Sequence, residues 1–313
     1  MENTAQSASD TPRISVLMAL YNADAFVADA IESILAQTVA DFELLILDDG
    51  STDRSAEVVA TYAEKDARIR FWGRENRGAP ATRNEMAAAA RAPYLAVMDA
   101  DDISLPDRFE RQIVFLEAHP EVVAVGGQSL LSDEDMRPIH VPRMPTDHDE
   151  IDDNHLSGVV SMAHSGLFMR AEAFHEVGGY DEGAPYSEDL DLWLRLAEIG
   201  RLANLPDVVV KYRLHENSIC GRNGSQQLED WRKASGAAWK RRGIPDREIS
   251  LNEWRPTHDP SSQLDFTVSW GWRAWRAGNR DTARHFFLKA LRSNPLSPDA
   301  WKGLIFGTLR RPD

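Results

Sequence analysis

Three carboxylates lie close together directly after an apolar segment, and this pattern suggests a site for a positive charge. The residues YLAVM at 94–98 have strand character and lead into Asp99, Asp101 and Asp102. Carboxylates this close raise one another's pKa unless a cation or an array of donors offsets the repulsion. A divalent metal with oxygen ligands, itself bound to a phosphate, would offset it. Asp102 could instead cap the helix expected to follow, which would leave Asp99 and Asp101 unexplained.

The first hundred residues alternate four times between strand and helix patterns, which predicts a parallel α/β sheet. Four apolar segments are expected to form its buried strands, at residues 14–20, 42–47, 69–72 and 94–98. Asp24 is the expected N-cap of the first helix. In such sheets ligands lie beyond the carboxyl ends of the strands, where Tyr21, Asp49 and Asp99 are found. Three strands therefore direct polar groups toward one crevice, although turn formation alone could explain the neighbouring Gly50.

The second part of the main domain shows weaker patterns. Helices are expected at residues 106–119 and 187–199, and strands at residues 122–125, 164–169 and 208–212. Residues 132–157 are acidic and punctuated by proline, so we expect them to form a long surface loop. Ser187 can cap the second helix, acids occupy its first turn, and Trp193 is expected in the core.

The charge is acidic overall and unevenly distributed. The chain of 313 residues has a formal net charge of −15, which argues against broad binding of nucleic acid through phosphate neutralisation. Residues 268–313 contain nine Lys and Arg against three Asp and Glu, a local charge of +6. This basic tail could approach anionic lipid at the inner face of a membrane, or form an ordinary solvated helix face.

Single features exclude several classes of protein. Cys220 is the only cysteine, so neither an intrachain disulfide nor a cysteine-rich zinc site can form. Residues 1–11 are typical of a disordered lead and lack the apolar core of a signal peptide. No segment approaches the length of a membrane-spanning helix. We therefore expect a cytoplasmic protein.

The loop after the first strand lacks the glycines of the common nucleotide fingerprints. It reads LYNAD at 20–24, without a Gly-x-Gly-x-x-Gly pattern, which argues against a nicotinamide or flavin enzyme. A sugar nucleotidyltransferase also uses paired carboxylates, but it would normally carry a glycine-rich loop and a basic residue at this point. The chain also lacks a Walker A lysine loop and a Gly-x-Ser-x-Gly elbow.

A helical extension at residues 226–313 is expected to follow a main domain at residues 12–225. The helical pattern from Trp272 to Leu304 is interrupted at Gly278 and Asn294, which resembles a single tetratricopeptide-type helix pair. Several such repeats are normally needed for an independent stack. We therefore expect the pair to pack on the main domain or on a partner.

The motifs of the main domain together resemble those of the family 2 glycosyltransferases, which have the GT-A fold. The resemblance covers about residues 12–218 and rests on the segments SVLMALYNADAFVADAIESILAQT, FELLILDDGSTDRS, NRGAPATRN, MDADDISLPDRF, GGYDE, SEDLDLWLRL and YRLHENS. Each segment alone is a weak signal, whereas their order and spacing are specific. The resemblance implies an α/β fold with a Rossmann-like mixed sheet flanked by helices, and a nucleotide-sugar donor.

The resemblance assigns four residues to the nucleotide. Ala19 and Tyr21 would line the base and ribose pocket, where the ring of Tyr21 supplies a flat apolar surface. Asp49 would accept hydrogen bonds from the uracil of a uridine diphosphate (UDP) sugar. Arg83 would offer forked donors to the nucleotide or its phosphates.

Asp99 and Asp101 match the Asp-x-Asp pair of the family. Asp99 would lie toward the ribose, and Asp101 would bind a Mn²⁺ or Mg²⁺ ion that bridges the diphosphate, with Asp102 assisting through water. His215 lies where related enzymes often place a further metal or phosphate contact, and a plain surface role is equally open. The ion would stabilise the charge left on the diphosphate.

Glu188 and Asp189 would serve the acceptor. An attacking hydroxyl must lose a proton, and a carboxylate opposite the leaving group can accept it. Asp189 matches the general base of the family, and Glu188 stands beside it. Both acids could instead only complement the dipole of their helix. A single displacement of this kind inverts the anomeric configuration.

The resemblance thus implies transfer of one sugar to a hydroxyl of a glycan or lipid-linked acceptor, in cell-envelope polysaccharide synthesis. The Gln-x-x-Arg-Trp motif and the membrane helices of processive synthases are absent, which favours a non-processive enzyme. The alternative outside the enzymes is a scaffold with a degenerate transferase domain. The intact acids at Asp49, Asp99, Asp101 and Asp189 argue against that alternative.

Overall fold

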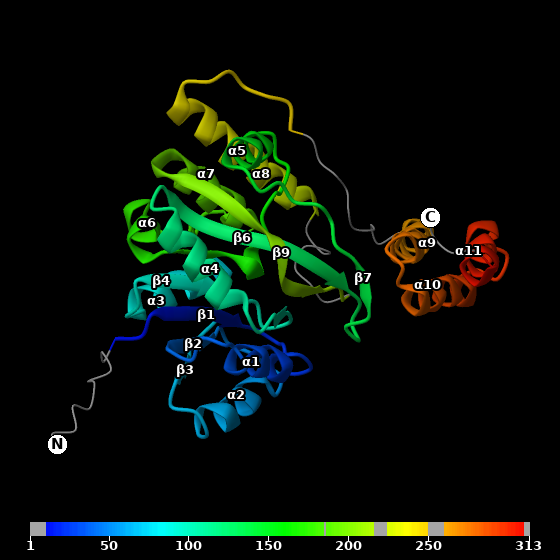
Figure 1. The fold of residues 1–313 in the computed structure, drawn as a ribbon, viewed down its shortest axis with the longest axis horizontal. Coiled ribbons are helices and arrows are strands. Elements are labelled where there is room, and N and C mark those ends of the chain that lie inside the picture. The colour runs from blue at the N-terminus through cyan, green and yellow to red at the C-terminus, as the bar shows by residue number, and fades with distance from the viewer. Residues whose placement is uncertain (1–10, 185, 216–223, 250–259, 310–313) are drawn as a thin grey trace.

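A nine-stranded mixed sheet forms the centre of the main domain (Figure 1). The computed structural model describes residues 11–184, 186–215, 224–249 and 260–309. Along the sheet the strands follow the order β3 (Ile69–Gly73), β2 (Phe42–Asp48), β1 (Ile14–Leu20), β4 (Tyr94–Val97), β8 (Phe168–Arg170), β6 (Val122–Ser132), β9 (Arg201–Arg213) and β5 (Ile103–Ser104). A short strand, β7 (Pro138–His140), pairs with β6 beside this path. Residues 1–10 of the expected lead, Cys220 and the end of the YRLHENS motif lie outside the described residues.

The strands β1 to β4 are parallel and confirm the first half of the predicted architecture. β1 pairs with β2 and β4, and β2 pairs with β3. The connecting helices are α1 (Val27–Leu35), α2 (Ser55–Ala63) and α3 (Ala79–Ala89). The prediction of Asp24 as N-cap was wrong, because α1 begins after a turn in which the N–H of Val27 donates to Ala23 O at 2.9 Å. The N–H of Asp24 instead donates to Asp53 Oδ2 at 3.1 Å.

The strands β6 and β9 are much longer than the sequence pattern predicts. They pair in parallel along most of their length, with register shifts around Gly126. The polar side chains of Gln128 and Asn204 interrupt the apolar pattern, but they are buried and donate hydrogen bonds to main-chain carbonyls. Asn204 donates to Pro145 O and Ser161 O, both at 2.7 Å, and Gln128 donates to main-chain carbonyls on either side. Buried polar residues of this kind hid the length of the strand pair.

Residues 132–157 do not form the expected surface loop. They contain β7 and the helix α5 (His148–Leu156), whose N-cap Asp147 accepts the N–H of Asp149 at 2.9 Å. Ile151, His155 and Leu156 of this helix are buried. The acidic composition describes only the outer side of α5. The expected strand at 164–169 is also shorter, because a 3-10 turn at His164–Gly166 precedes β8.

Helices cover both faces of the sheet. Along β1, Val16 and Met18 pack into one core and Leu17 into the other, as the alternation of a strand requires. The first core also receives α1, α2 and α4 (Arg108–Ala118). The second receives α3, α5, α6 (Ala171–Glu176), α7 (Glu188–Ile199) and α8 (Gly224–Arg242). Trp193 of α7 is fully buried, as predicted.

The C-terminal extension contains α9 (Pro260–Arg276), α10 (Arg280–Ser293) and α11 (Pro298–Leu309) (Figure 1). The helix boundaries match the predicted breaks at Gly278 and Asn294. Trp270 shares one hydrophobic cluster with Ile139 of β7, and its ring stacks on His140 with 5.7 Å between centroids. The extension therefore packs on the β6–β7 hairpin. Its relation to tetratricopeptide repeats stays a prediction.

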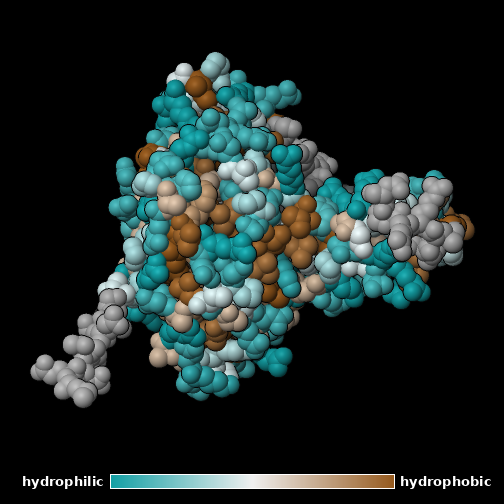
Figure 2. All heavy atoms as spheres, in the orientation of Figure 1, coloured by the Kyte–Doolittle hydropathy of each residue, from teal (hydrophilic) through white to brown (hydrophobic). Residues whose placement is uncertain are grey.

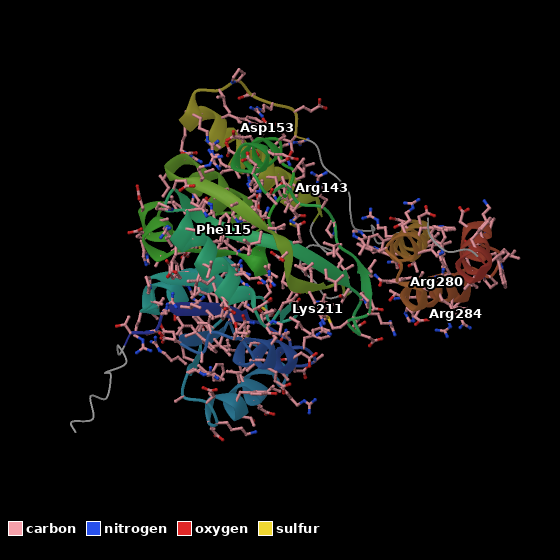
Figure 3. The ribbon with its side chains drawn as sticks, in the orientation of Figure 1. Phe115, Arg143, Asp153, Lys211, Arg280 and Arg284 are labelled. Carbon is pink, nitrogen blue, oxygen red and sulfur yellow. The ribbon has the colours of Figure 1, made fainter. Side chains whose placement is uncertain are left out.

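The outer surface of the extension combines apolar and basic side chains. Leu296 and Trp301 are 86% and 50% exposed. Figure 2 shows hydrophobic residues at the outer edge of this unit, over α11. Figure 3 shows Arg280 and Arg284 along α10. In the described part of the chain, no helix has both the length and the apolar character that crossing a membrane requires.

Candidate active site

The predicted nucleotide residues Ala19, Tyr21 and Asp49 lie together where β1 and β2 end. Ala19 pairs in register with Leu47, and the N–H of Asp49 donates to Leu20 O at 2.9 Å. The ring of Tyr21 is 54% exposed, so it offers an accessible flat surface. The structure thus brings these three residues to one edge of the sheet.

The carboxylate of Asp49 organises the loop in front of α3. Its oxygens accept the backbone N–H groups of Arg77 at 3.0 Å and Gly78 at 2.8 Å, and Arg74 Nη2 lies 3.1 Å from Oδ1. Gly78 has a φ of 89°, a left-handed conformation that favours glycine and lets the chain turn into α3. Each carboxylate oxygen has two lone pairs, so Oδ2 keeps the capacity to accept a hydrogen bond from a base.

The guanidinium of Arg83 joins two acids that are distant in sequence. Its Nη2 lies 2.8 Å from Asp99 Oδ1, and its Nη1 lies 3.1 Å from Glu188 Oε1. Arg83 is only 6% exposed. Burial opposes its charge, but the two carboxylates outweigh burial and raise its pKa. Arg83 therefore fixes the end of β4 against the start of α7.

The three acids after β4 have unequal environments. Burial opposes the charged form of Asp99, but Arg83 and further positive neighbours lower its pKa. Asp101 is partly exposed, and its Oδ2 lies 2.8 Å from His215 Nε2. Asp102 is buried, and its Oδ1 accepts the backbone N–H of Arg213 at 2.8 Å. Burial, together with the charges of Asp101 and Asp99, raises the pKa of Asp102 well above its usual range. Asp102 therefore anchors β9, and its predicted contact through water stays a prediction.

A buried arginine lies beneath these acids and offsets part of their repulsion. Arg108 donates to the carbonyls of Ser165 and Val97, both at 2.9 Å, and of Leu167 at 3.1 Å. Burial lowers the pKa of Arg108 to about 9, although Asp99 and Asp102 favour its charged form. Its signal in the sequence is only its place in the MDADDISLPDRF segment.

Asp101 and His215 form the donor set that best fits a metal ion. A carboxylate and an imidazole are both common ligands of divalent ions. Among the described residues, no group of three or more His, Cys, Asp or Glu is arranged to hold an ion alone. Two protein donors suit an ion that takes its remaining ligands from a diphosphate and water. The residues fit Mn²⁺ or Mg²⁺ in that arrangement.

Glu188 and Asp189 begin α7 on the other side of Arg83. Ser187 occupies the predicted N-cap position, but its side chain makes no capping hydrogen bond. Burial raises the pKa of Asp189 to about 6, although the N–H of Leu190 and the charge of Arg83 both act to lower it. Burial also raises the pKa of Glu188 to about 7, against Arg83. A carboxyl group with a pKa near neutrality can accept a proton effectively at physiological pH.

Sequence reasoning missed the role of His164 and Tyr180. His164 Nε2 lies 2.9 Å from the hydroxyl of Tyr180, and burial lowers the pKa of His164 to about 3. Both side chains are packed against the site, and the guanidinium of Arg83 lies 5.8 Å from the ring centroid of Tyr180. The GGYDE segment is a signal for Tyr180, whereas His164 belongs to no motif.

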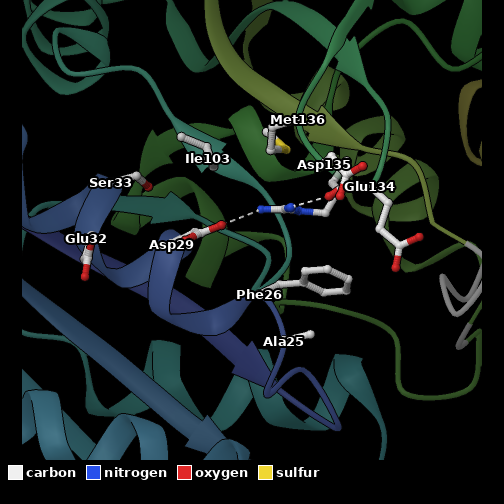
Figure 4. A pocket seen from close by; sticks show the side chains of 10 residues that line it. Ala25, Phe26, Asp29, Glu32, Ser33, Ile103, Glu134, Asp135 and Met136 are labelled. Carbon is white, nitrogen blue, oxygen red and sulfur yellow. Dashed lines mark hydrogen bonds and ion pairs between the residues drawn. The ribbon is translucent and has the colours of Figure 1, made fainter. Parts of the chain in front are cut away.

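An open pocket of about 700 Å³ lies beside Phe26 (Figure 4), whose ring centroid is 4.8 Å from that of His215. Phe26 lines it from the turn before α1, Asp29 lines it from α1, and Glu134 lines it from the β6–β7 hairpin. Arg213 lies across it and donates to Asp29 Oδ2 at 3.0 Å, Glu134 O at 2.6 Å and Asp101 O at 2.7 Å. Arg213 thus supports the backbone of the metal-binding candidate Asp101.

Comparison with known proteins identifies the family of the chain. Residues 15–178 match the model described as glycosyl transferase family 2. EpsE of Bacillus subtilis (strain 168), which is assigned as a glycosyltransferase, is 32% identical over 226 residues, covering 70% of this chain and 79% of the relative. An uncharacterised glycosyltransferase of Haemophilus influenzae is 29% identical over 233 residues, or 71% of this chain and 72% of the relative.

Solved structures show the same fold at lower identity. S. aureus TarS 1–349 in complex with UDP has a TM-score of 0.55 at 15% identity, covering 94% of this chain and 88% of that one. The mannosyltransferase PcManGT from Pyrobaculum calidifontis, in complex with GDP-Man and Mn²⁺, has a TM-score of 0.56 at 16% identity, covering 96% and 80%. The expected GT-A architecture is confirmed. The chain therefore belongs to glycosyl transferase family 2 and is a glycosyltransferase with the GT-A fold.

Proposed function

We propose that the protein transfers a sugar from a nucleotide-diphosphate sugar, preferably a UDP-sugar, to a hydroxyl group of an acceptor. The transfer inverts the anomeric configuration and depends on a divalent metal ion. The acceptor is a glycan or a lipid-linked sugar of cell-envelope polysaccharide synthesis. The observation that carries the proposal is the guanidinium of Arg83, which contacts both Asp99 and Glu188 and so brings the end of β4 next to the start of α7. Transfer requires a site for a leaving diphosphate and a base on the opposite side.

The residues divide into two groups, a donor side (Asp49, Asp99 and Asp101) and an acceptor side (Glu188 and Asp189). On the donor side, Tyr21 and Asp49 hold the base, while Asp101 and His215 bind the ion. When bound, Mn²⁺ or Mg²⁺ stabilises the charge of the departing diphosphate. On the acceptor side, Asp189 takes the proton of the attacking hydroxyl. Neighbouring structures crystallised with UDP, UDP-GlcNAc or GDP-Man support a nucleotide-sugar donor.

A panel of nucleotide sugars tests this proposal. We expect UDP-glucose or UDP-N-acetylglucosamine with Mn²⁺ to raise the melting temperature, since a ligand at 100 times its Kd stabilises by about 2.7 kcal/mol. GDP-mannose is the matched comparison for the base. The same panel, assayed for transfer, distinguishes hexose from N-acetylhexosamine donors. Failure of every nucleotide sugar to stabilise the protein or to turn over would contradict the proposal.

The C-terminal extension supports a peripheral contact with the inner face of a membrane. Its apolar residues Leu296 and Trp301 lie exposed in a part of the chain with a local charge of +6. Aromatic and basic side chains together favour the surface of an anionic bilayer. Such a contact would bring the crevice near a lipid-linked acceptor.

Vesicle pelleting tests the membrane contact. The full chain should pellet with phosphatidylglycerol vesicles and not with phosphatidylcholine vesicles. The double variant Leu296→Asp/Trp301→Asp should remain in the supernatant. Val114→Asp is the matched control, because Val114 is 60% exposed on α4 of the main domain. Equal pelleting of the double variant and the control would reject the contact.

A further inference from the structure

The residue after Arg83 on α3 holds the backbone of a loop that leads to the acceptor side. Asn84 Nδ2 donates to Tyr180 O at 2.9 Å, and the N–H of Tyr180 donates to Asn84 Oδ1 at 2.8 Å. One amide side chain thus satisfies both main-chain groups of Tyr180, as a neighbouring strand would. Gly179 permits this close approach, because a Cβ there would lie 2.7 Å from Asn84 Oδ1 and its φ is +74°.

The side chain of Tyr180 is fixed as firmly as its backbone. Its hydroxyl lies 2.9 Å from His164 Nε2, and its ring meets Phe174 edge to face with 5.4 Å between centroids. Arg83 approaches the ring from α3. The residue is 3% exposed. Tyr180 is therefore a rigid point whose position relative to α3 depends on Asn84.

Consecutive turns connect this rigid point to α7. The N–H of Ala184 donates to Asp181 O at 3.3 Å, and the N–H of Ser187 donates to Ala184 O at 3.2 Å. The N–H of Asp191 then donates to Ser187 O at 3.0 Å, which starts the helix. These hydrogen bonds among residues 181–184 and 187–191 link the backbone after Tyr180 to the first turn of α7, so we expect a displacement of Tyr180 to shift Glu188 and Asp189.

We propose that Asn84 is a positioning residue of the transfer reaction. By holding Tyr180, it sets the distance between the acceptor side and the donor side. The inference rests on the proposed function, in which Asp189 is the base. Asn84 touches no reacting group in this scheme and acts through Tyr180. A misplacement of about 1 Å at a reacting group can lower the rate about 100-fold. The two hydrogen bonds between Asn84 and the backbone of Tyr180 can therefore affect catalysis strongly.

The test compares Asn84→Ala with Asn279→Ala. Asn279 Nδ2 also donates to a backbone carbonyl, that of Ile139, at 3.0 Å, but it lies in the C-terminal extension. We expect Asn84→Ala to lower kcat for transfer by about 10- to 100-fold. Its Kd for UDP with Mn²⁺ should stay within about twofold of the wild type, because Asp49 and Asp101 are untouched. Asn279→Ala should leave both quantities unchanged.

Hydrogen exchange supplies a readout that is independent of turnover. The amide of Tyr180 should exchange faster in Asn84→Ala than in the wild type, and at the wild-type rate in Asn279→Ala. An active wild type together with an Asn84→Ala variant of unchanged kcat would overturn the role of Asn84 alone. Equal losses in UDP affinity and in kcat would also overturn it, since Asn84 would then serve the donor side. A wild-type chain that binds no nucleotide sugar would instead overturn the proposed function.

Discussion

The donor side and the acceptor side of the candidate site are both built from carboxylate groups. The electrostatic surroundings of these groups differ between the two sides. On the donor side, Asp49 and Asp99 meet arginine side chains directly, at 3.1 Å and 2.8 Å, and the pKa of Asp99 is lowered. On the acceptor side, burial outweighs the one shared arginine and raises the pKa of Glu188 to about 7 and of Asp189 to about 6. Asp99 therefore stays charged, whereas Glu188 and Asp189 can accept a proton near pH 7.

Arg83 contributes to this difference in ionisation between the donor-side and the acceptor-side acids. It lies closer to Asp99 than to Glu188, at 2.8 Å and 3.1 Å, so its charge favours the ionised donor-side acid. In the described part of the chain Asp189 forms no ion pair with Arg83, and burial affects its pKa more than the charge of Arg83 does. One buried arginine can therefore leave neighbouring acids in different states of ionisation.

Replacing the base should give the largest effect. We expect Asp189→Asn to lower kcat for transfer by about 10²- to 10⁴-fold, the usual contribution of a positioned general base. UDP binding should survive, because the donor side is unchanged. Transfer rates of the variant and the wild type, with calorimetric titration of UDP, check both statements.

The control for this variant is Asp149→Asn, which removes an acid from the first turn of α5. If Asp189 only complemented the dipole of its helix, the two variants would behave alike. Undiminished transfer by Asp189→Asn would refute its assignment as the base.

Loss of a metal-binding candidate should have a smaller effect, confined to the donor side. We expect Asp101→Asn to weaken UDP binding with Mn²⁺ by about 10- to 100-fold, the range found when metal sites are disturbed. UDP binding in the presence of EDTA should be equal in the variant and the wild type. Calorimetry with and without Mn²⁺ measures both. UDP binding of equal strength with and without the ion would contradict the role proposed for Asp101.

The donor side could be predicted from the sequence because it depends on local patterns. An apolar strand followed by an acid places Asp49 and Asp99 at the carboxyl edge of a parallel sheet, whatever the rest of the chain does. Trp193 was also predictable, since helical spacing gives its direction. The roles of these residues come from the resemblance of the motifs and stay predictions.

The link between the two sides could not be predicted, because it depends on tertiary contacts. Arg83 and Glu188 are separated by 105 positions, and no periodicity relates them. The raised pKa of Asp189 comes from burial, which depends on how distant segments pack around the start of α7. Buried polar residues such as Asn204 likewise concealed the length of β9. Polar groups that are satisfied inside a protein look exposed in its sequence.

A further expected effect concerns stability and follows from the raised pKa of Asp189. Between about pH 4 and pH 6 the folded protein binds more protons at this group than the unfolded chain does. This contribution to the free energy of unfolding is present below pH 4 and is lost as the pH rises through 6. Asp189→Asn does not titrate, so its stability relative to the wild type should increase over the same range, by about 1–3 kcal/mol.

Urea unfolding at pH 4.5 and pH 8 measures this difference, with Asp149→Asn as the control that should show no such increase. A stability difference independent of pH would mean that Asp189 has the same pKa in the folded protein and in the unfolded chain, and the electrostatic contrast between the two sides would fail. If Asp189→Asn loses transfer and is more stable than the wild type at high pH, burial of this base lowers the stability of the protein and raises the pKa that the base needs for proton transfer.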